Sequence, residues 1–436
     1  MKFDATIRQR IIDAVDAGFD DQLAFTADMV RFDSTRGNEA AMQQFMADAL
    51  RARGYAVDHW KIEVDDIKDL RGFAPVEFVD YAQAFNVVGT LTPKEVKGRS
   101  LIINGHVDVV PPCDTDRWTT PPFQPRIAEG RMYGRGAGDM KSGLAAAIYA
   151  IEALKAVGLA PAAPIFLQSV VEEECTGNGA LACIQRGYKA DGALVPEPFG
   201  ASIMRAEVGL MWLCLDIEGD PQHASAAFQN VGANALEKAI HIWPFIKRLE
   251  DEWNARKVNH PVYKDHPHPV RVNLGKLAGG DWVSSVPAKA RMEIRLGVLE
   301  GEDLAAIRQE IRDRVAEACA ADPYLANHPP KITFHGFMAD GYVLEPGSDI
   351  EAAMGRAHET VFGEPVTSSI SSAVTDARYF GLYQNTPSIV YGATCGLPHG
   401  IDEYVDLESL KQVTRTYALF IAEWCGLEPI QNAGAS

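Results

Sequence analysis

The chain has 436 residues, which is more than one ordinary hydrophobic core accommodates, so we expect two domains. Hydrophobic residues make up 47% and charged residues 23% of the chain, as is usual for a soluble globular protein. The formal net charge of −18 at pH 7 would repel nucleic acid and anionic membranes, so neither is expected as a partner.

Cellular location is predicted from apolar runs and cysteines. Acidic residues interrupt every apolar stretch near the N-terminus, and no apolar run is long enough to span a bilayer, so we expect neither a signal peptide nor a membrane span. The seven cysteines are odd in number and form no Cys-x-x-Cys pair. That pattern favours reduced thiols and a cytoplasmic protein.

The first half of the chain alternates helices with short apolar strands. The periodicity predicts helices over residues 22–32, 40–53 and 140–157, and strands over residues 85–91, 100–104, 164–171 and 192–195. Short buried strands that alternate with helices are typical of an α/β sheet covered on both faces.

Near residue 208 the order changes to β-α-β-β-α-β, which is typical of a small ferredoxin-like α+β domain. The strands are expected over residues 210–217, 270–277, 290–298 and 331–337, and the helices over residues 232–257, with a kink at Pro244, and 302–321. An α/β pattern then returns, with helices over 350–362 and 407–425 and a strand over 388–391. We therefore predict one domain in two parts, residues 1–207 and 339–436, interrupted by an inserted domain over residues 208–338.

Charged and imidazole side chains follow the ends of the predicted strands of the first domain. They are His106 and Asp108, the run Glu172 to Glu174, Glu197, and, after a short loop, His399; Asp139 stands in GRGAGDMKSG directly before a helix. Ligands of open α/β sheets bind outside the carboxyl ends of the strands, so we expect these side chains to converge on one crevice. Clustered carboxylates are costly unless cations neutralise them.

The charges of this set suit two divalent ions. Asp139, Glu174 and Glu197 bring three negative charges, His106 and His399 are neutral ligands, and one hydroxide would balance two zinc ions. Two metals about 3.5–4 Å apart can share a carboxylate and a water. Zinc suits mixed histidine and carboxylate ligation, but the same ligands hold cobalt or manganese.

Five motifs in this order resemble one family of zinc enzymes: GHVDVVPP, GRGAGDMKSG, VVEEECTGNGA, VPEP and GLPHGIDEYV. The family contains acetylornithine deacetylase, succinyl-diaminopimelate desuccinylase, aminoacylase and bacterial glutamate carboxypeptidase. The resemblance covers nearly the whole chain. It implies a mixed-sheet, zinc-peptidase-like catalytic domain with an inserted ferredoxin-like lid, two zinc ions per chain, and a homodimer that forms through the lid.

The resemblance also implies a role for each motif residue. His106 and Glu197 would bind one ion, Glu174 and His399 the other, and Asp139 both. Asp108 would hold the imidazole of His106 and fix its tautomer. The register of CTGNG makes Glu173 the general base, although relatives often have Asp where this chain has Glu172. A cis peptide bond is implied between Asp139 and Met140.

Three lid residues match substrate-contacting positions of the family. His223, in GDPQHASAAFQNVGANA, would support the oxyanion in the partner subunit's active site. Asn273 and Arg295 would contact substrate, and the planar guanidinium suits a carboxylate. The alternatives are an ordinary loop histidine at His223 and an inter-strand ion pair at Arg295.

The expected activity is therefore that of a metal-dependent amidohydrolase, a deacylase of N-acyl amino acids or related small molecules. A dipeptidase or carboxypeptidase and an amidohydrolase of non-amino-acid amides or amines are close alternatives. A metal-free binding module is the non-enzyme alternative, and the complete set of ligands and base argues against it. A dinucleotide-binding oxidoreductase is disfavoured, because GRGAGDMKSG lacks the GxGxxG spacing of a dinucleotide-binding loop.

Overall fold

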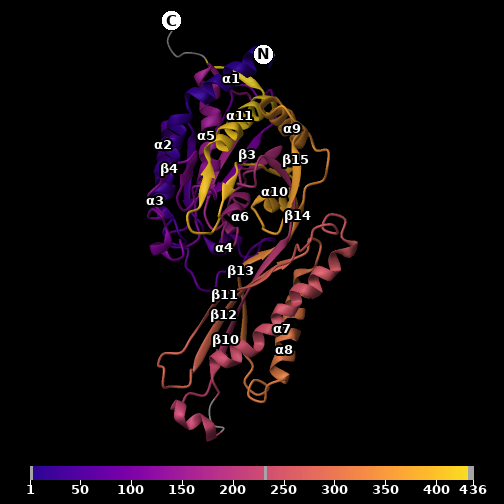
Figure 1. The fold of residues 1–436 in the computed structure, drawn as a ribbon. Coiled ribbons are helices and arrows are strands. Elements are labelled where there is room, and N and C mark those ends of the chain that lie inside the picture. Colours follow the sequence, from indigo (N-terminus) through magenta and orange to yellow (C-terminus); the bar gives the residue numbers. More distant parts are fainter. Residues whose placement is uncertain (1–2, 230–232, 431–436) are drawn as a thin grey trace.

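A nine-stranded mixed sheet forms the larger body of the molecule, and a four-stranded sheet with two long helices extends from it (Figure 1). The computed structural model describes residues 3–229 and 233–430. The strand order of the large sheet is β1-β2-β7-β3-β8-β16-β9-β14, with β15 also paired to β9. Its strands are β1 (Ala56–Lys61), β2 (Phe85–Leu91), β3 (Leu101–His106), β7 (Ile165–Val170), β8 (Gly192–Val195), β9 (Ser202–Glu207), β14 (Tyr342–Val343), β15 (Thr367–Ser371) and β16 (Ser388–Val390).

The centre of the large sheet is parallel. Strand β3 pairs in parallel with β7 and β8, and β8 pairs in parallel with β16. The carboxyl ends of these four strands therefore lie along one edge of the sheet. Strands β1 and β2 are antiparallel to their neighbours, which makes the whole sheet mixed.

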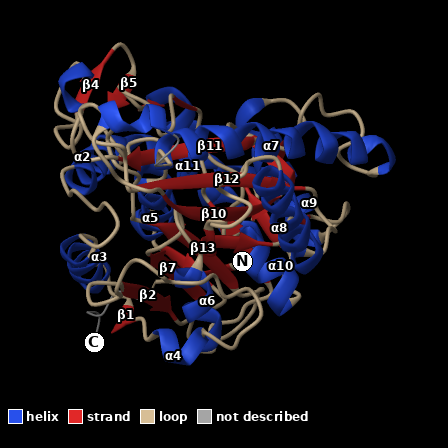
Figure 2. Cartoon of the chain, turned by 90° about the horizontal axis from the view of Figure 1, so that it is seen from below, coloured by secondary structure: helices blue, strands red, loops and turns tan. Residues whose placement is uncertain are grey.

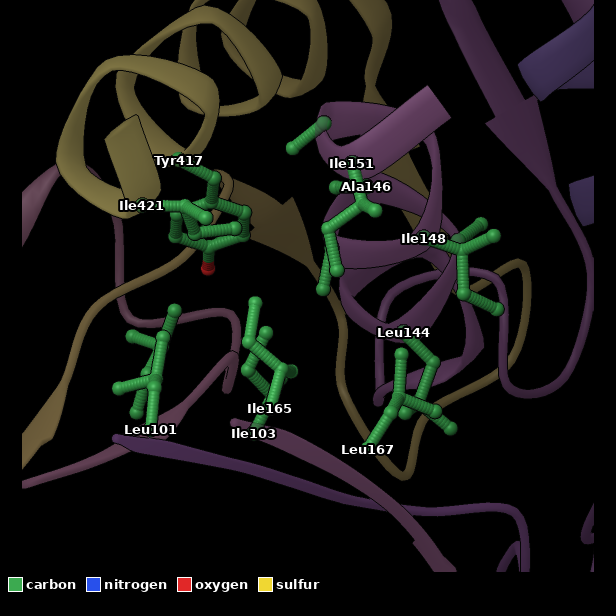
Figure 3. Packing of buried hydrophobic residues seen from close by; sticks show 14 of the residues in the cluster. Leu101, Ile103, Leu144, Ala146, Ile148, Ile151, Ile165, Leu167, Tyr417 and Ile421 are labelled. Carbon is green, nitrogen blue, oxygen red and sulfur yellow. The ribbon is translucent and has the colours of Figure 1, made fainter. Parts of the chain in front are cut away.

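Helices cover both faces of this sheet (Figure 2), and successive side chains along β3 point alternately to the two faces. Leu101 and Ile103 point to one face, where Leu144 and Ile148 of one helix pack against them; Ile102 points to the opposite face. Figure 3 shows this first cluster, with side chains of two helices above the strands. Each fully buried Leu or Ile contributes about 1.5–3 kcal/mol to folding. The helices of this body are α1 (Ala5–Ala17), α2 (Phe19–Val30), α3 (Ala40–Ala52), α4 (Val64–Ile67), α5 (Lys141–Ala156), α6 (Asn178–Gln185), α9 (Asp349–Phe362), α10 (Ala377–Gln384) and α11 (Leu407–Trp424).

The four-stranded sheet has the predicted β-α-β-β-α-β order. Its strands lie in the order β11-β12-β10-β13 and are all antiparallel, which is the ferredoxin-like arrangement, and Figure 2 shows them side by side in that order. Its helices and strands share a hydrophobic cluster distinct from the main cluster of the larger sheet. The elements are β10 (Gly209–Glu218), α7 (Ala235–Arg256), β11 (Val272–Gly279), β12 (Lys289–Val298), α8 (Leu304–Ala320) and β13 (Lys331–Ala339).

Short elements make up the rest of the secondary structure in residues 3–229 and 233–430. They are two small sheets, β17-β18-β5-β4 and β19-β6, and three 3-10 helices. Their bounds are β4 (Arg126–Ala128), β5 (Arg131–Tyr133), β6 (Leu159–Pro161), β17 (Cys395–Gly396), β18 (Tyr404–Asp406), β19 (Leu427–Pro429), η1 (Thr115–Arg117), η2 (Ala224–Gln229) and η3 (Lys257–Asn259).

The predicted fold class is confirmed, and the long periodic elements lie within a few residues of their predicted bounds. Helix α7 continues through Pro244, and Gly232, where it was predicted to begin, lies outside the described residues. Several short or partly exposed elements were not predicted, among them α1, β1, β9 and α10. None of the described helices combines the length and apolar character needed to cross a membrane.

Candidate metal centre

The predicted ligand residues meet at the carboxyl edge of the parallel strands. His106 is the last residue of β3, and Glu173 and Glu174 follow β7. Glu197 follows β8, and Asp139 lies just before α5. The peptide bond between Asp139 and Met140 is cis, as predicted. His399 comes from the loop between β17 and β18.

The first group of ligand atoms surrounds the Nε2 atom of His106. This atom lies 3.2 Å from Asp139 Oδ1, 3.5 Å from Glu197 Oε1 and 3.8 Å from Glu173 Oε2. His106 is almost fully buried, and its Nδ1 atom lies 2.8 Å from the main-chain carbonyl oxygen of Asp108. If Nδ1 donates to that carbonyl, the lone pair of Nε2 is directed into the cluster.

The second group lies on the other side of Asp139. His399 Nε2 is 3.1 Å from the Glu174 carboxylate and 3.4 Å from Asp139 Oδ2. Asp139 thus presents one carboxylate oxygen to each histidine. The side chain of His399 is 53% exposed, whereas that of His106 is 1% exposed, so the cluster opens to solvent on the His399 side.

The donor chemistry fits divalent cations. Ligand atoms of His106, Glu173 and Glu197, and separately of His106, Asp139 and Glu174, lie within 4.8 Å of one another. Histidine nitrogens and carboxylate oxygens at such separations are the ligands of catalytic metals. A cation at either position would offset the repulsion among the carboxylates.

Burial and, after it, the charges of neighbouring groups shift the pKa values of the cluster. Burial, followed by the charge of Asp139, raises the pKa of Glu197 to about 8. Burial also raises the pKa of Glu173 well above its ordinary value. Burial disfavours charged His399, but Glu174 and Asp139 outweigh it and raise the pKa of His399 to about 11. Positive charge is therefore strongly favoured at this position.

Asp108 holds the turn after β7. Its buried carboxylate accepts hydrogen bonds from the backbone amides of Glu173, at 3.3 Å, and Glu174, at 3.0 Å. The closer contact to His106 is made by the Asp108 carbonyl, since carboxylate Oδ1 lies 3.6 Å from Nδ1. The residue thus contacts both the imidazole of His106 and the backbone that carries the two glutamates.

Glu172 points away from the cluster. Its carboxylate accepts two hydrogen bonds from Arg36, at 2.5 and 2.6 Å, and one from Tyr81, at 2.7 Å. Motif analysis did not single out Arg36 or Tyr81, because they lie in loops far from Glu172 in the sequence. The adjacent glutamates Glu172, Glu173 and Glu174 therefore have three different surroundings.

Glu403 is another buried carboxylate that the sequence analysis missed. It accepts hydrogen bonds from the amides of Gly136, Gly138 and Asp139, at 2.9–3.0 Å, and pairs with the buried Arg135. Its position within GLPHGIDEYV was an available signal, because Glu403 lies four residues after His399. The contact connects the His399 loop to the Asp139 loop.

Asp376 was also missed. It is 1% exposed, and neither of its carboxylate oxygens has a hydrogen-bond partner among the described residues. Burial raises the pKa of Asp376 to about 6. The sequence offered no periodic or motif signal for it beyond the acidic residue before α10.

The three lid residues lie outside this cluster within one chain. His223 is exposed, follows β10 and accepts hydrogen bonds from Ser225. Asn273 and Arg295 face each other on β11 and β12. Among the described residues Arg295 has no carboxylate partner; it donates to the carbonyl of Ser372 at 2.8 Å, so the alternative of an inter-strand ion pair is wrong.

Histidine and carboxylate ligands gathered at the carboxyl edge of a parallel sheet, with a ferredoxin-like domain inserted in the chain, are the features of a metal-dependent hydrolase. The model of Peptidase family M20/M25/M40 matches residues 102–423, and the chain belongs to that family.

Two relatives of known sequence cover most of the chain. N-formyl-4-amino-5-aminomethyl-2-methylpyrimidine deformylase of Halalkalibacterium halodurans is 25% identical over 448 aligned residues, which cover 98% of this chain and 99% of that protein. Succinyl-diaminopimelate desuccinylase of Paracoccus denitrificans is 28% identical over 333 residues, which cover 73% of this chain and 81% of that protein. Both names describe the removal of an acyl group, formyl in one and succinyl in the other.

Solved structures show the same fold. Human carnosine dipeptidase 1 superposes with a TM-score of 0.77 at 15% identity and covers 96% of this chain and 99% of its own. The dipeptidase Dug1p of Saccharomyces cerevisiae superposes with a TM-score of 0.78 at 16% identity and covers 96% of this chain and 98% of its own. At these identities the likeness establishes the fold alone.

Proposed function

We propose that this enzyme is a deacylase that hydrolyses the amide bond of an N-acyl amino acid or a related small molecule, with two divalent ions, preferably zinc. The observation that carries the proposal is Asp139, whose two carboxylate oxygens face His106 and His399 separately. His106 and Glu197 would hold one ion, Glu174 and His399 the second, and Asp139 both. When bound, the ions supply Lewis acidity to a water molecule and to the amide carbonyl.

Glu173 is proposed as the general base. No group among the described residues hydrogen-bonds its carboxylate, so the carboxylate is free to take a proton from water and deliver it to the leaving nitrogen. Glu172 is unsuited to this role because Arg36 and Tyr81 occupy its oxygens. Asp108 keeps Glu173 and Glu174 in register through their backbone amides.

The lid is proposed to complete the site. We propose the domain division 1–207, 208–338 and 339–436, which the separate hydrophobic clusters of the two sheets support. Arg295 is a half-buried cation that has no acidic partner in the part of the chain that the structure describes, and it is suited to bind a substrate carboxylate, with Asn273 beside it. His223 would reach a second active site across a homodimer and support the oxyanion there.

A cytoplasmic location belongs to the same proposal. All seven cysteines are unpaired, which suits a reducing compartment.

The chemistry of the acyl group is best tested with a panel of substrates. Metal content per chain would be measured together with hydrolysis of N-formyl, N-acetyl and N-succinyl amino acids, N-formyl aminomethylpyrimidines and dipeptides, before and after chelation. We expect two ions per chain, with activity that chelation removes and zinc restores. Formyl-pyrimidine hydrolysis alone would favour the non-amino-acid alternative suggested by the deformylase relative. Absence of both metal and hydrolysis would contradict the proposal.

A further inference from the structure

The loop between α2 and α3 contacts three of the segments that form the metal centre. Ser34 Oγ donates to the carbonyl of Val107 at 2.6 Å, directly after His106. The buried ammonium of Lys141 donates to the carbonyl of Phe32 at 3.0 Å, at the start of α5 and two residues after Asp139. From the same loop, Arg36 reaches Glu172 at the end of β7.

The Arg36–Glu172 contact has the geometry of a specific pair. The guanidinium donates Nε to Glu172 Oε1 and Nη2 to Oε2, so both oxygens are engaged by one planar group. The side chains are 22% and 3% exposed, and Tyr81 and Thr176 donate to the same Oε2, at 2.7 and 3.0 Å. Such a carboxylate has little freedom to rotate.

Glu172 also has an unusual backbone. Its φ of 70° lies in the left-handed region, which few residues other than glycine adopt. Its carbonyl accepts hydrogen bonds from the amides of Thr176, at 2.9 Å, and Gly177, at 2.7 Å. A strained residue of this kind persists only where its surroundings determine it fully. Here those surroundings include Arg36.

The direction of the next two side chains depends on this turn. Glu173 and Glu174 follow Glu172 immediately, and their amides are held by Asp108 on the other side. Arg36 therefore fixes the turn through the side chain of Glu172, and Asp108 fixes it through the amides of Glu173 and Glu174. If Arg36 were lost, Glu172 could leave its left-handed conformation and change the direction of both carboxylates.

We infer that Arg36 is a positioning residue of the metal centre, which acts through Glu172 to hold Glu173 and Glu174 in place. The inference rests on the proposed function, because it assumes that Glu174 binds a metal ion. It predicts that Arg36 controls metal affinity although it contacts no ligand atom. Groups that orient metal ligands typically change affinity by about 10–100-fold when they are lost.

The test compares Arg36→Gln with Arg31→Gln, a matched control in which an exposed arginine at the C-terminal end of α2 loses its pair with Asp28. Zinc affinity would be measured by competition with a chromophoric chelator, together with thermal unfolding and kcat. We expect Arg36→Gln to weaken at least one zinc site about 10–100-fold and to lower kcat, and Arg31→Gln to leave both unchanged. Arg36→Lys, which keeps the charge but not the planar fork, should be intermediate.

Two further variants separate positioning from general stability. Tyr81→Phe removes one hydrogen bond to the same carboxylate and should weaken zinc binding less than Arg36→Gln; it also serves if Arg36→Gln does not fold. Since Arg36 acts through Glu172, the double variant Arg36→Gln/Glu172→Gln should lose less affinity than the sum of the two single losses.

Unchanged zinc affinity in folded Arg36→Gln, or in Tyr81→Phe if the former does not fold, would overturn the inference even if the melting temperature falls. Strictly additive losses in the double variant would also overturn it. A parent chain that binds no zinc would overturn the proposed function and this inference together. A parent chain that binds zinc, with an Arg36→Gln variant that binds it equally well, would overturn the inference alone.

Discussion

At the scale of single residues, chemically identical side chains have different roles because their surroundings differ. Glu172 is saturated by Arg36 and Tyr81, and Glu174 lies against His399. Glu173 is 7% exposed, and its carboxylate has no hydrogen bond among the described residues. A buried carboxylate without a partner is costly for folding, and such groups are common at catalytic sites.

Glu173→Gln should lower kcat by about 10²–10⁴-fold, because the amide cannot take a proton from water. Both metal ions should remain bound, since the proposed ligands are intact. Glu174→Gln is the matched variant, and it should lose one ion. Kinetics and metal analysis of both proteins would check this. Loss of an ion from Glu173→Gln would instead make Glu173 a ligand, which its place in a group with His106 and Glu197 also permits.

At the scale of elements, the metal centre depends on loops that are connected behind it. Glu403, just before β18, binds three amides of the segment that leads to Asp139. Its pairing with Arg135 is buried on both sides, with side chains 1% exposed. Removal of one partner of such a pair leaves an uncompensated buried charge.

Glu403→Gln should therefore lower the free energy of unfolding by about 3–5 kcal/mol, because Arg135 would lose its counter-charge. Denaturant titration followed by circular dichroism would measure the loss. Glu408→Gln, an exposed change at the start of α11, should stay within about 0.5 kcal/mol of the parent. Equal stability of the two variants would show that the Glu403 pair contributes little.

At the scale of the whole molecule, the lid carries candidate substrate residues that its own chain does not bring to the metal centre. The strands of the lid extend away from the large sheet (Figure 1). Strand β10 begins directly after β9 of the large sheet, and His223 follows the opposite end of β10. In the proposed homodimer, His223 of one chain would serve the metal centre of the other, and the two-fold symmetry would give both centres the same histidine.

The enzyme should therefore have twice the 47.5 kDa mass of one chain when light scattering is measured in solution. His223→Ala and Glu173→Gln dimers should each be nearly inactive. A mixture that exchanges subunits should regain about a quarter of parental activity, because about half of the dimers become mixed and each mixed dimer has one complete site of two. A monomeric mass, or no recovery after verified exchange, would rule out His223 acting in the partner.

The order of motifs was sufficient to predict the fold class and the side chains that meet at the strand ends. Strand β8 has its predicted bounds because buried apolar runs in a parallel sheet are continuous and easy to recognise, and the antiparallel strand β2 also has its predicted bounds. Two of the elements that were missed, β9 and α10, are short, and β9 pairs with strands far along the chain.

The sequence by itself determined the ligand types, their order and the family resemblance, because these depend on residue chemistry and on periodicity along the chain. Only the tertiary structure decided which glutamate is free and which carboxylates hold the loops. Arg36 lies 136 residues from Glu172, and Arg135 lies 268 residues from Glu403. No local pattern encodes such pairs, because folding brings their atoms together and burial then determines how strongly they interact.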